Sequence, residues 1–156
     1  MPARGVILWS GPKYEKTARF VHSDVKQIVF SPNEQFLLTN NHRRDDVAAI
    51  KVFHIPTGKL LRTFPLYPDG FLEDYNKRYK GKGQDDQPPP QPPPFQWSHD
   101  DKYLARMGKG LISIFETPGM RLLDKRSLAC PGIHEFQWSP AANILAYWVS
   151  AKQTNI

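Results

Sequence analysis

The sequence predicts an all-β fold made of repeated four-stranded sheets, and two interleaved repeats and their spacing predict it. In the first repeat, an aromatic residue is followed by serine, a turn of four or five residues and an apolar strand. Its copies begin at Phe30-Ser31, Trp97-Ser98 and Trp138-Ser139. In the second repeat, a strand ends in an aromatic residue, a turn containing proline or glycine follows, and another strand begins. Its copies contain Trp9, Phe53 and Phe115.

The spacing of these repeats is typical of propeller blades. Trp97 and Trp138 lie 41 residues apart, which is the length of a four-stranded blade. Phe30 and Trp97 lie 67 residues apart, so an insertion of about 26 residues separates them. We therefore predict a partial β-propeller of a divergent type that resembles WD repeats, with two complete four-stranded blades flanked by two half-blades.

The predicted elements follow the chain in order. Residues 5–20 form the outer half of one blade, 25–64 a complete blade, 65–94 an insertion, 95–126 a second complete blade and 133–149 the inner half of a third. Runs of β-branched and aromatic residues bounded by turn residues indicate each strand. The expected strands are Gly5–Trp9, Lys13–Phe20, Val25–Phe30, Phe36–Asn40, Ala49–His54, Lys59–Phe64, Phe95–Trp97, Tyr103–Met107, Leu111–Phe115, Arg121–Arg126, Ile133–Trp138 and Ile144–Val149.

The insertion is polar and ends in a proline-rich run. Pro88–Pro94 cannot pair in a sheet and favours polyproline II geometry. We interpret it as a semi-rigid surface linker, and the alternative is a ligand for a WW-type domain. Within the insertion, Phe71–Tyr79 comes closest to helical periodicity, enough for a turn or two of helix.

Two half-blades and two whole blades cannot close a ring. We therefore expect the sequence to be a piece of a larger propeller. Alone, it would expose strand edges, and we expect it to aggregate or to remain molten.

Composition indicates a globular protein without disulfides. The 156 residues are 40% hydrophobic and 23% charged, which is ordinary for a folded protein. Cys130 has no second cysteine with which to form a disulfide. We find no signal-peptide pattern and no apolar run long enough to span a membrane, so we expect a cytoplasmic protein without a membrane partner.

Two basic clusters are candidates for contact with RNA or the ribosome, although each is alternatively a solvated charged loop. The net charge of +6 is spread along the chain, which tolerates a polyanionic partner but does not require one. The first cluster is Arg43 and Arg44, followed directly by two aspartates. The second cluster combines basic side chains with an aromatic ring, which suits contact with phosphate groups and stacking of nucleobases. It comprises Lys77, Arg78, Tyr79, Lys80 and Lys82.

The sequence contains no motif that indicates an enzyme, so we expect no catalytic, cofactor or metal site and no small-molecule substrate. The five histidines lack metal-ligand spacing, and no glycine-rich phosphate loop is present. Ser31, Ser98 and Ser139 occupy one repeat position. This predicts hydroxyl groups that accept hydrogen bonds from backbone N–H groups in turns, rather than a single activated nucleophile.

Three stretches resemble the divergent propeller found in eukaryotic translation initiation factor three, in the subunit designated b. They are residues 19–32, residues 95–107, and residues 114–149. The most specific part is Glu116-Thr117-Pro118-Gly119-Met120-Arg121-Leu122-Leu123-Asp124-Lys125, because blade geometry does not demand this run. The resemblance covers nearly all of the chain outside residues 65–94, whose length departs from the connector expected in the family.

The resemblance implies a nine-bladed propeller within a multi-subunit factor that binds the small ribosomal subunit and supports recruitment of messenger RNA and initiator tRNA. The implied partners are the other subunits of the factor and the rRNA and proteins of the small ribosomal subunit, with mRNA reached through the complex. In the family an RNA-recognition motif precedes the propeller and a helical segment follows it, and neither is among these residues. The alternatives are the propeller of the alternative initiator-tRNA-delivery factor, a propeller scaffold outside translation and, remotely, a propeller hydrolase.

Overall fold

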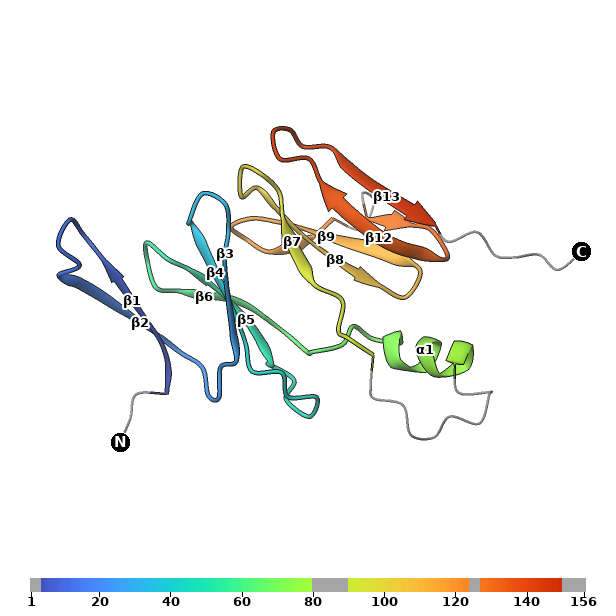
Figure 1. Cartoon of the computed structure of the whole chain (residues 1–156), viewed down its shortest axis with the longest axis horizontal. Helices are drawn as coiled ribbons and strands as arrows, with labels where there is room; N and C mark the ends of the chain where they lie inside the picture. The colour runs from blue at the N-terminus through green and yellow to red at the C-terminus, as the bar shows by residue number, and fades with distance from the viewer. Residues whose placement is uncertain (1–3, 80–89, 124–126, 150–156) are drawn as a thin grey trace, which may run out of the picture. The chain divides into compact units, whose positions relative to one another are not determined.

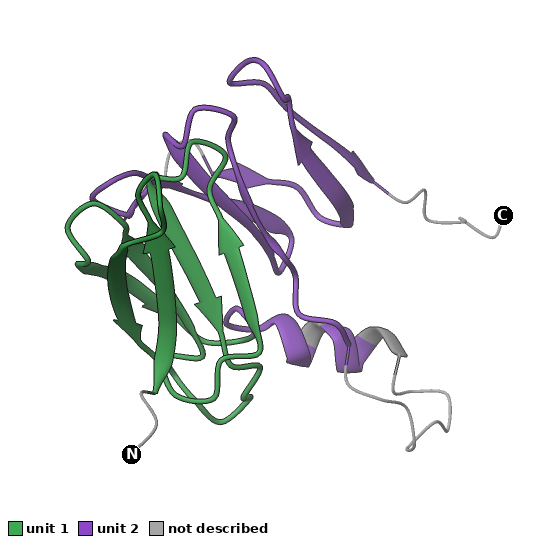
Figure 2. Cartoon of the chain, turned by 60° about the vertical axis from the view of Figure 1, so that its left-hand side comes forward, with its two compact units in different colours: residues 1–66 green, residues 67–156 purple. Residues whose placement is uncertain are grey.

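The computed structural model describes residues 4–79, 90–123 and 127–149, and its strands form four antiparallel sheets (Figure 1). The predicted all-β class is confirmed for these residues, which also include one α-helix. The chain divides into two compact units, residues 1–66 and 67–156, drawn in green and purple in Figure 2. Each unit is described by itself.

The first unit contains a hairpin and a four-stranded sheet. The hairpin consists of β1 (Gly5–Ser10) and β2 (Lys16–Val21). The sheet has the strand order β3 (Gln27–Phe30), β4 (Phe36–Asn40), β5 (Ile50–His54) and β6 (Leu60–Phe64). Consecutive strands are neighbours, and the longest connection in this sheet is the loop between β4 and β5.

An aromatic contact joins the hairpin to the sheet in the first unit. Phe20, Leu37 and Phe53 form a buried cluster, and the rings of Phe20 and Phe53 have centroids 5.2 Å apart. Beside the cluster, Nδ1 of His22 and the hydroxyl of Thr39 lie 2.6 Å apart, both buried. Burial of such large apolar side chains stabilises the packing by roughly 1.5–3 kcal/mol each.

The second unit contains a helix, a larger sheet and another hairpin. The helix α1 spans Phe71–Tyr79. The sheet has the order β7 (Phe95–Trp97), β8 (Tyr103–Gly108), β9 (Leu111–Glu116) and β10 (Arg121–Leu122), and β11 (Leu128–Ala129) also pairs with β9. The hairpin consists of β12 (Ile133–Trp138) and β13 (Leu145–Val149). The core of the second unit contains Ala105, Ile112, Ile114 and Phe136.

Two predicted strands were wrong at one end. The strand expected at Lys13–Phe20 begins at Lys16 and ends at Val21, because residues 11–14 form a turn in which the N–H of Tyr14 donates to the Gly11 carbonyl at 3.1 Å. The strand expected at Arg121–Arg126 ends at Leu122, and pairing with β9 resumes at Leu128. Residues 124–126 lie outside the described residues. The other predicted strands differ from the observed ones by at most two residues at either end.

The two larger sheets share one pairing register. Leu37 lies opposite Phe53 in one sheet, and Leu104 lies opposite Phe115 in the other. Each leucine is the sixth residue after the repeat serine, and each phenylalanine is the aromatic residue of the second repeat. The repeats found in the sequence therefore specify which residues face each other across the middle strands of a sheet.

Candidate interaction surfaces

The repeat serines shape turns, as predicted. Oγ of Ser31 accepts a hydrogen bond from the N–H of Phe36 at 2.9 Å, and Oγ of Ser98 accepts one from the N–H of Tyr103 at 2.9 Å. Oγ of Ser139 instead accepts from the N–H groups of residues 141 and 142, both at 3.2 Å. Each hydroxyl therefore accepts hydrogen bonds from the backbone of its own turn.

The described residues contain no group of three or more His, Cys, Asp or Glu side chains that could hold a metal ion. They also contain no helix that is both long and apolar enough to cross a membrane. Cys130 is partly buried and interacts with Tyr147, and this hydrogen bond raises the pKa of the Tyr147 hydroxyl.

The first predicted basic cluster lies in the loop between β4 and β5, and the loop is tied together internally. The side-chain amide of Asn41 donates to Asp46 at 2.7 Å and its oxygen accepts from the N–H of Arg43 at 3.0 Å. The other Asp46 oxygen accepts from the N–H of Ala48 at 2.9 Å. The hydrogen bonds from Asn41 and Ala48 hold the pKa of Asp46 below its ordinary value.

Acidic neighbours offset the charge of Arg43. Its Nη1 lies 3.3 Å from a carboxylate oxygen of Asp24, and its Nε lies 3.6 Å from one of Asp45. Arg44 is exposed beside it. Exposed ion pairs are worth about 0–1 kcal/mol, so a phosphate group could replace these carboxylates at little cost. The loop presents two arginines, but the two aspartates that follow them cancel their charge.

The second predicted basic cluster begins at the end of α1. Lys77 is exposed on the helix. The side chains of Arg78 and Tyr79, and all of Lys80 and Lys82, lie outside the described residues. Basic side chains in the last turn of a helix also interact favourably with the negative end of the helix dipole. This interaction is a structural explanation for the cluster that requires no RNA contact.

The segment before α1 packs against the proline-rich run. The ring of Tyr67 stacks on that of Phe71 with centroids 5.8 Å apart, and its hydroxyl donates to the Pro90 carbonyl at 2.6 Å. Pro93 is buried. A polyproline ligand must present its prolines to an aromatic groove. Pro94 is exposed, and the interpretation of this run as a semi-rigid surface linker stays a prediction.

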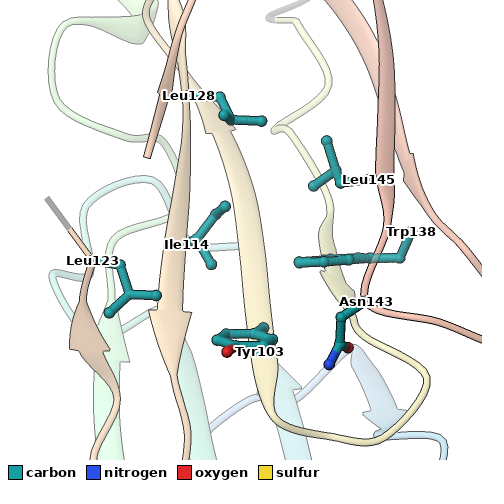
Figure 3. Close-up of a pocket in the computed structure, with 7 residues that line it drawn as sticks. All are labelled: Tyr103, Ile114, Leu123, Leu128, Trp138, Asn143 and Leu145. Carbon is teal, nitrogen blue, oxygen red and sulfur yellow. The ribbon is translucent and has the colours of Figure 1, made fainter. Parts of the chain in front are cut away.

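A cavity of about 330 Å³ lies between the sheet of the second unit and the β12–β13 hairpin (Figure 3). It is lined by Tyr103, Ile114, Leu123, Leu128, Trp138, Asn143 and Leu145. The rings of Tyr103 and Trp138 are stacked at one side, with centroids 6.0 Å apart and planes 14° apart. No local pattern in the sequence signals this cavity, because it depends on how two separate sheets pack together.

The polar rim of the cavity is a hydrogen-bonded group. The side-chain amide of Asn143 donates to Asp100 at 3.1 Å, and the hydroxyl of Ser98 donates to the other Asp100 oxygen at 2.9 Å. Burial opposes ionisation of Asp100, but its hydrogen bonds from Lys102, Ser98 and Asn143 outweigh it and lower its pKa. The rest of the lining is apolar or aromatic, so the cavity suits an apolar or aromatic group.

Comparisons with known proteins find sequence relatives of this chain that share one name. No protein-family model matches it. In Bombyx mori, the subunit designated B of eukaryotic translation initiation factor 3 is 40% identical to it over 150 residues, covering 94% of this chain and 19% of that protein. The protein of the same name from Xenopus laevis is 40% identical over 149 residues, and that of Culex quinquefasciatus is 37% identical over 147. The chain thus spans about a fifth of the length of these relatives.

A solved structure also shares the fold. It is named "Crystal structure of the eukaryotic initiation factor", and it superposes with a TM-score of 0.68 at 19% sequence identity. The superposition covers 97% of this chain and 34% of that chain. At this identity the likeness concerns the fold alone.

The fold and its turns define a class of protein. It is an all-β protein of repeated antiparallel sheets, in which the repeat serines accept hydrogen bonds from backbone N–H groups. The sequence relatives then identify the particular protein to which this chain is related, namely eukaryotic translation initiation factor 3, in its subunit designated B. The resemblance inferred from residues 116–125 and the neighbouring stretches is thereby confirmed.

Proposed function

We propose that the chain is a scaffold in translation initiation, acting as part of the propeller of an initiation-factor subunit. The factor would bind the small ribosomal subunit and support recruitment of messenger RNA and initiator tRNA. The partners of the chain would be the other subunits and the rRNA and proteins of the small ribosomal subunit. Its compartment would be the cytoplasm, and it would need no cofactor and carry out no reaction.

One observation carries this proposal: 40% identity over 94% of the chain to relatives that share one name, that of a single subunit of the factor. The match of 150 residues extends over both units. The shared name disfavours the alternative initiator-tRNA-delivery factor and a generic scaffold outside translation, because these relatives at 36–40% identity all carry it.

A propeller arrangement is supported by the repeats themselves. Two sheets of sequential strands share one register, and each hairpin corresponds to half of such a sheet. The β1–β2 hairpin carries the second repeat and the β12–β13 hairpin carries the first. Two complete blades between two half-blades is the arrangement that we propose.

We also propose that the basic cluster beginning at Lys77 contacts ribosomal RNA. Lys77 is exposed, and no acidic residue adjoins residues 77–82 in the sequence, whereas two aspartates directly follow Arg44. The loop is the weaker candidate, because Asp24 and Asp45 already pair with Arg43.

Affinity purification of the tagged chain from eukaryotic cells tests the scaffold proposal. Other subunits of the factor should be enriched by mass spectrometry, and the chain should cosediment with the small ribosomal subunit. The matched control is Leu37→Asp with Leu104→Asp, which places a charge in each fully buried position and unfolds both sheets. Equal enrichment by the control, or recovery of initiator tRNA without factor subunits, would contradict the proposal.

Charge reversal tests the RNA contact. Lys77, Arg78, Lys80 and Lys82 are changed together to glutamate, and the control changes four exposed lysines elsewhere: Lys13, Lys16, Lys26 and Lys59. Loss of four phosphate contacts should lower the slope of log affinity against log salt by roughly 3 units. Similar weakening by both variants would show a nonspecific charge effect and would refute the assigned contact.

A further inference from the structure

We propose that the chain contains a binding site for a polyproline II helix, and that its own residues 90–94 occupy this site. The site is an aromatic platform formed by Tyr67 and by Phe71, the first residue of α1. We call the contact between this platform and residues 90–94 the clasp. It lies in the chain between β6 and β7, far from either end of the sequence, and it does not depend on the proposed function.

The burial of residues 90–94 has the period of a polyproline II helix. Such a helix has about three residues per turn, so residues that are three positions apart lie on one face. Pro93 is buried and Pro90 is partly buried, whereas Gln91 and Pro94 are exposed. Pro92, on the third face, is partly buried. The segment therefore turns the face of Pro90 and Pro93 toward the protein and the opposite face toward solvent.

The platform offers both of the contacts by which a polyproline II helix is recognised. Backbone carbonyls in this helix have no internal partner, so they can accept a hydrogen bond from another side chain. The hydroxyl of Tyr67 donates to the Pro90 carbonyl at 2.6 Å. The rings of Tyr67 and Phe71 stack with centroids 5.8 Å and planes 23° apart, which gives one continuous aromatic surface. Domains that bind proline-rich segments use aromatic grooves in the same way.

Both partners of the clasp are fixed to the second unit. The N–H of Phe71 donates to the Pro68 carbonyl at 3.1 Å, which closes a turn between the two aromatic residues. Pro68 lies close to the end of β8, since a Cβ added to Gly108 would be 3.6 Å from the Cβ of Pro68. On the other side, β7 begins at Phe95, directly after Pro94. In Figure 1 the segment that leads into β7 passes beside the start of α1.

The clasp closes the insertion at its base. Tyr67 and Pro90 are 23 positions apart, so their hydrogen bond closes a loop that contains α1. The entropic cost of closing a flexible loop grows only slowly with its length, so a small number of contacts at the base can hold a long insertion. The start of α1 is thereby held on the second unit. The buried face of the proline segment is at the same time withheld from other polyproline-binding domains, such as those of the WW type.

Hydrogen exchange measured by mass spectrometry on the whole chain tests the clasp. Tyr67→Phe removes the hydroxyl and keeps the ring, so amide exchange in α1 should become roughly three- to tenfold faster, as expected for loss of one hydrogen bond. The matched control is Tyr14→Phe, the same change at an exposed tyrosine, which should leave α1 unchanged. Exchange of α1 at the rate of an unfolded chain in the parent, or equal rates in the two variants, would overturn the proposal.

Two proline substitutions test which face is bound. Pro93→Ser, on the buried face, should accelerate exchange in α1 as Tyr67→Phe does, whereas Pro94→Ser, on the exposed face, should not. Because Tyr67→Phe and Pro93→Ser disrupt the same contact, the double variant should exchange no faster than the faster of the two single variants. Equal effects of the two proline substitutions, or effects that multiply in the double variant, would overturn the clasp.

A free peptide tests whether the platform is a binding site for polyproline. In the Pro93→Ser variant, a peptide with the sequence of residues 90–94 should restore slow exchange in α1 at millimolar concentration, roughly the effective concentration of a tethered ligand. The control is the same peptide carrying Pro93→Ser, which should restore nothing. Restoration by both peptides, or by neither, would overturn the assignment of a polyproline site.

Discussion

The indole of Trp138 donates a hydrogen bond to the backbone carbonyl of Gln96 at 3.2 Å, and the Gln96 side chain donates one to the carbonyl of Phe136 at 2.8 Å. This reciprocal pair joins β7 to β12, two strands that lie in different sheets. Together with the buried side chain of Phe136, it holds the β12–β13 hairpin on the sheet.

Gln96→Leu should loosen this hairpin by about 1–2 kcal/mol, because the partly buried carbonyl of Phe136 loses its donor. Hydrogen exchange measured by mass spectrometry should show faster exchange in β12 and β13, with exchange in β3 and β4 as the internal reference. Gln137→Leu is the control, since Gln137 is exposed on the same hairpin and its change should cost less than about 0.5 kcal/mol. Equal effects of the two changes would contradict this prediction.

Ser98→Ala should destabilise the protein more than Ser139→Ala. The hydroxyl of Ser98 is fully buried, accepts from the N–H of Tyr103 and donates to Asp100, so its loss should cost about 1–2 kcal/mol. Ser139 accepts two longer bonds in an exposed turn, and its loss should cost about 0.5 kcal/mol. Urea unfolding of each variant measures the difference, and the reverse order would refute the explanation.

The buried His22 should make the first unit sensitive to acid. Burial, and then the charge of Lys51, hold its pKa below the ordinary value, whereas Asp46 and the backbone of Ala48 act in the opposite direction. The unfolded chain therefore binds more protons than the folded one below about pH 6.5, so the free energy of unfolding should fall as the pH falls through that value.

Two variants separate these causes. His22→Asn should remove most of this pH dependence between about pH 7 and 5, because the titrating group is gone. Lys51→Gln should reduce it and keep a donor near the Val21 carbonyl, which Lys51 contacts at 3.3 Å. Thermal unfolding across the pH range is the measurement. An unchanged profile in the His22 variant would show that another group is responsible.

Removing the acidic partners of Arg43 should strengthen binding to a single-stranded RNA probe. Asp24→Asn with Asp45→Asn releases the guanidinium from both carboxylates, and the affinity for oligouridylate should rise roughly threefold at low salt. Fluorescence anisotropy measures this affinity. Glu15→Gln with Glu34→Gln is the control, since it makes the same change in net charge at exposed positions elsewhere. An equal rise in the control would show that the loop has no special role.

Local pattern was sufficient to predict most of the secondary structure. The strands Phe36–Asn40, Phe95–Trp97 and Ile133–Trp138 and the helix Phe71–Tyr79 have the predicted bounds. Runs of apolar and aromatic residues bounded by turn residues indicated these strands, and helical periodicity indicated the helix. The strand expected at Arg121–Arg126 instead ends at Leu122, although the N–H of Leu123 still donates to the Ile114 carbonyl at 2.8 Å.

The cavity and the contact between Gln96 and Trp138 could not be predicted in this way. Those two residues are 42 positions apart in the chain, and their meeting depends on how one sheet packs on another. The basic clusters were found as patterns of charge, but the pairing of Arg43 with Asp24 joins two loops that no local pattern connects. Composition indicates which residues are charged, and the fold decides which charges are already neutralised.

Backbone bonds preserve the repeat where side chains do not. The N–H of Ile55 donates to the Gln35 carbonyl at 2.9 Å, and the N–H of Thr117 donates to the Lys102 carbonyl at 3.0 Å, at equivalent positions of the two larger sheets. Neither side chain is needed for either bond, so evolution can exchange glutamine for lysine there without shifting a strand. Such positions let the outer surface of a sheet acquire new partners while its framework stays constant.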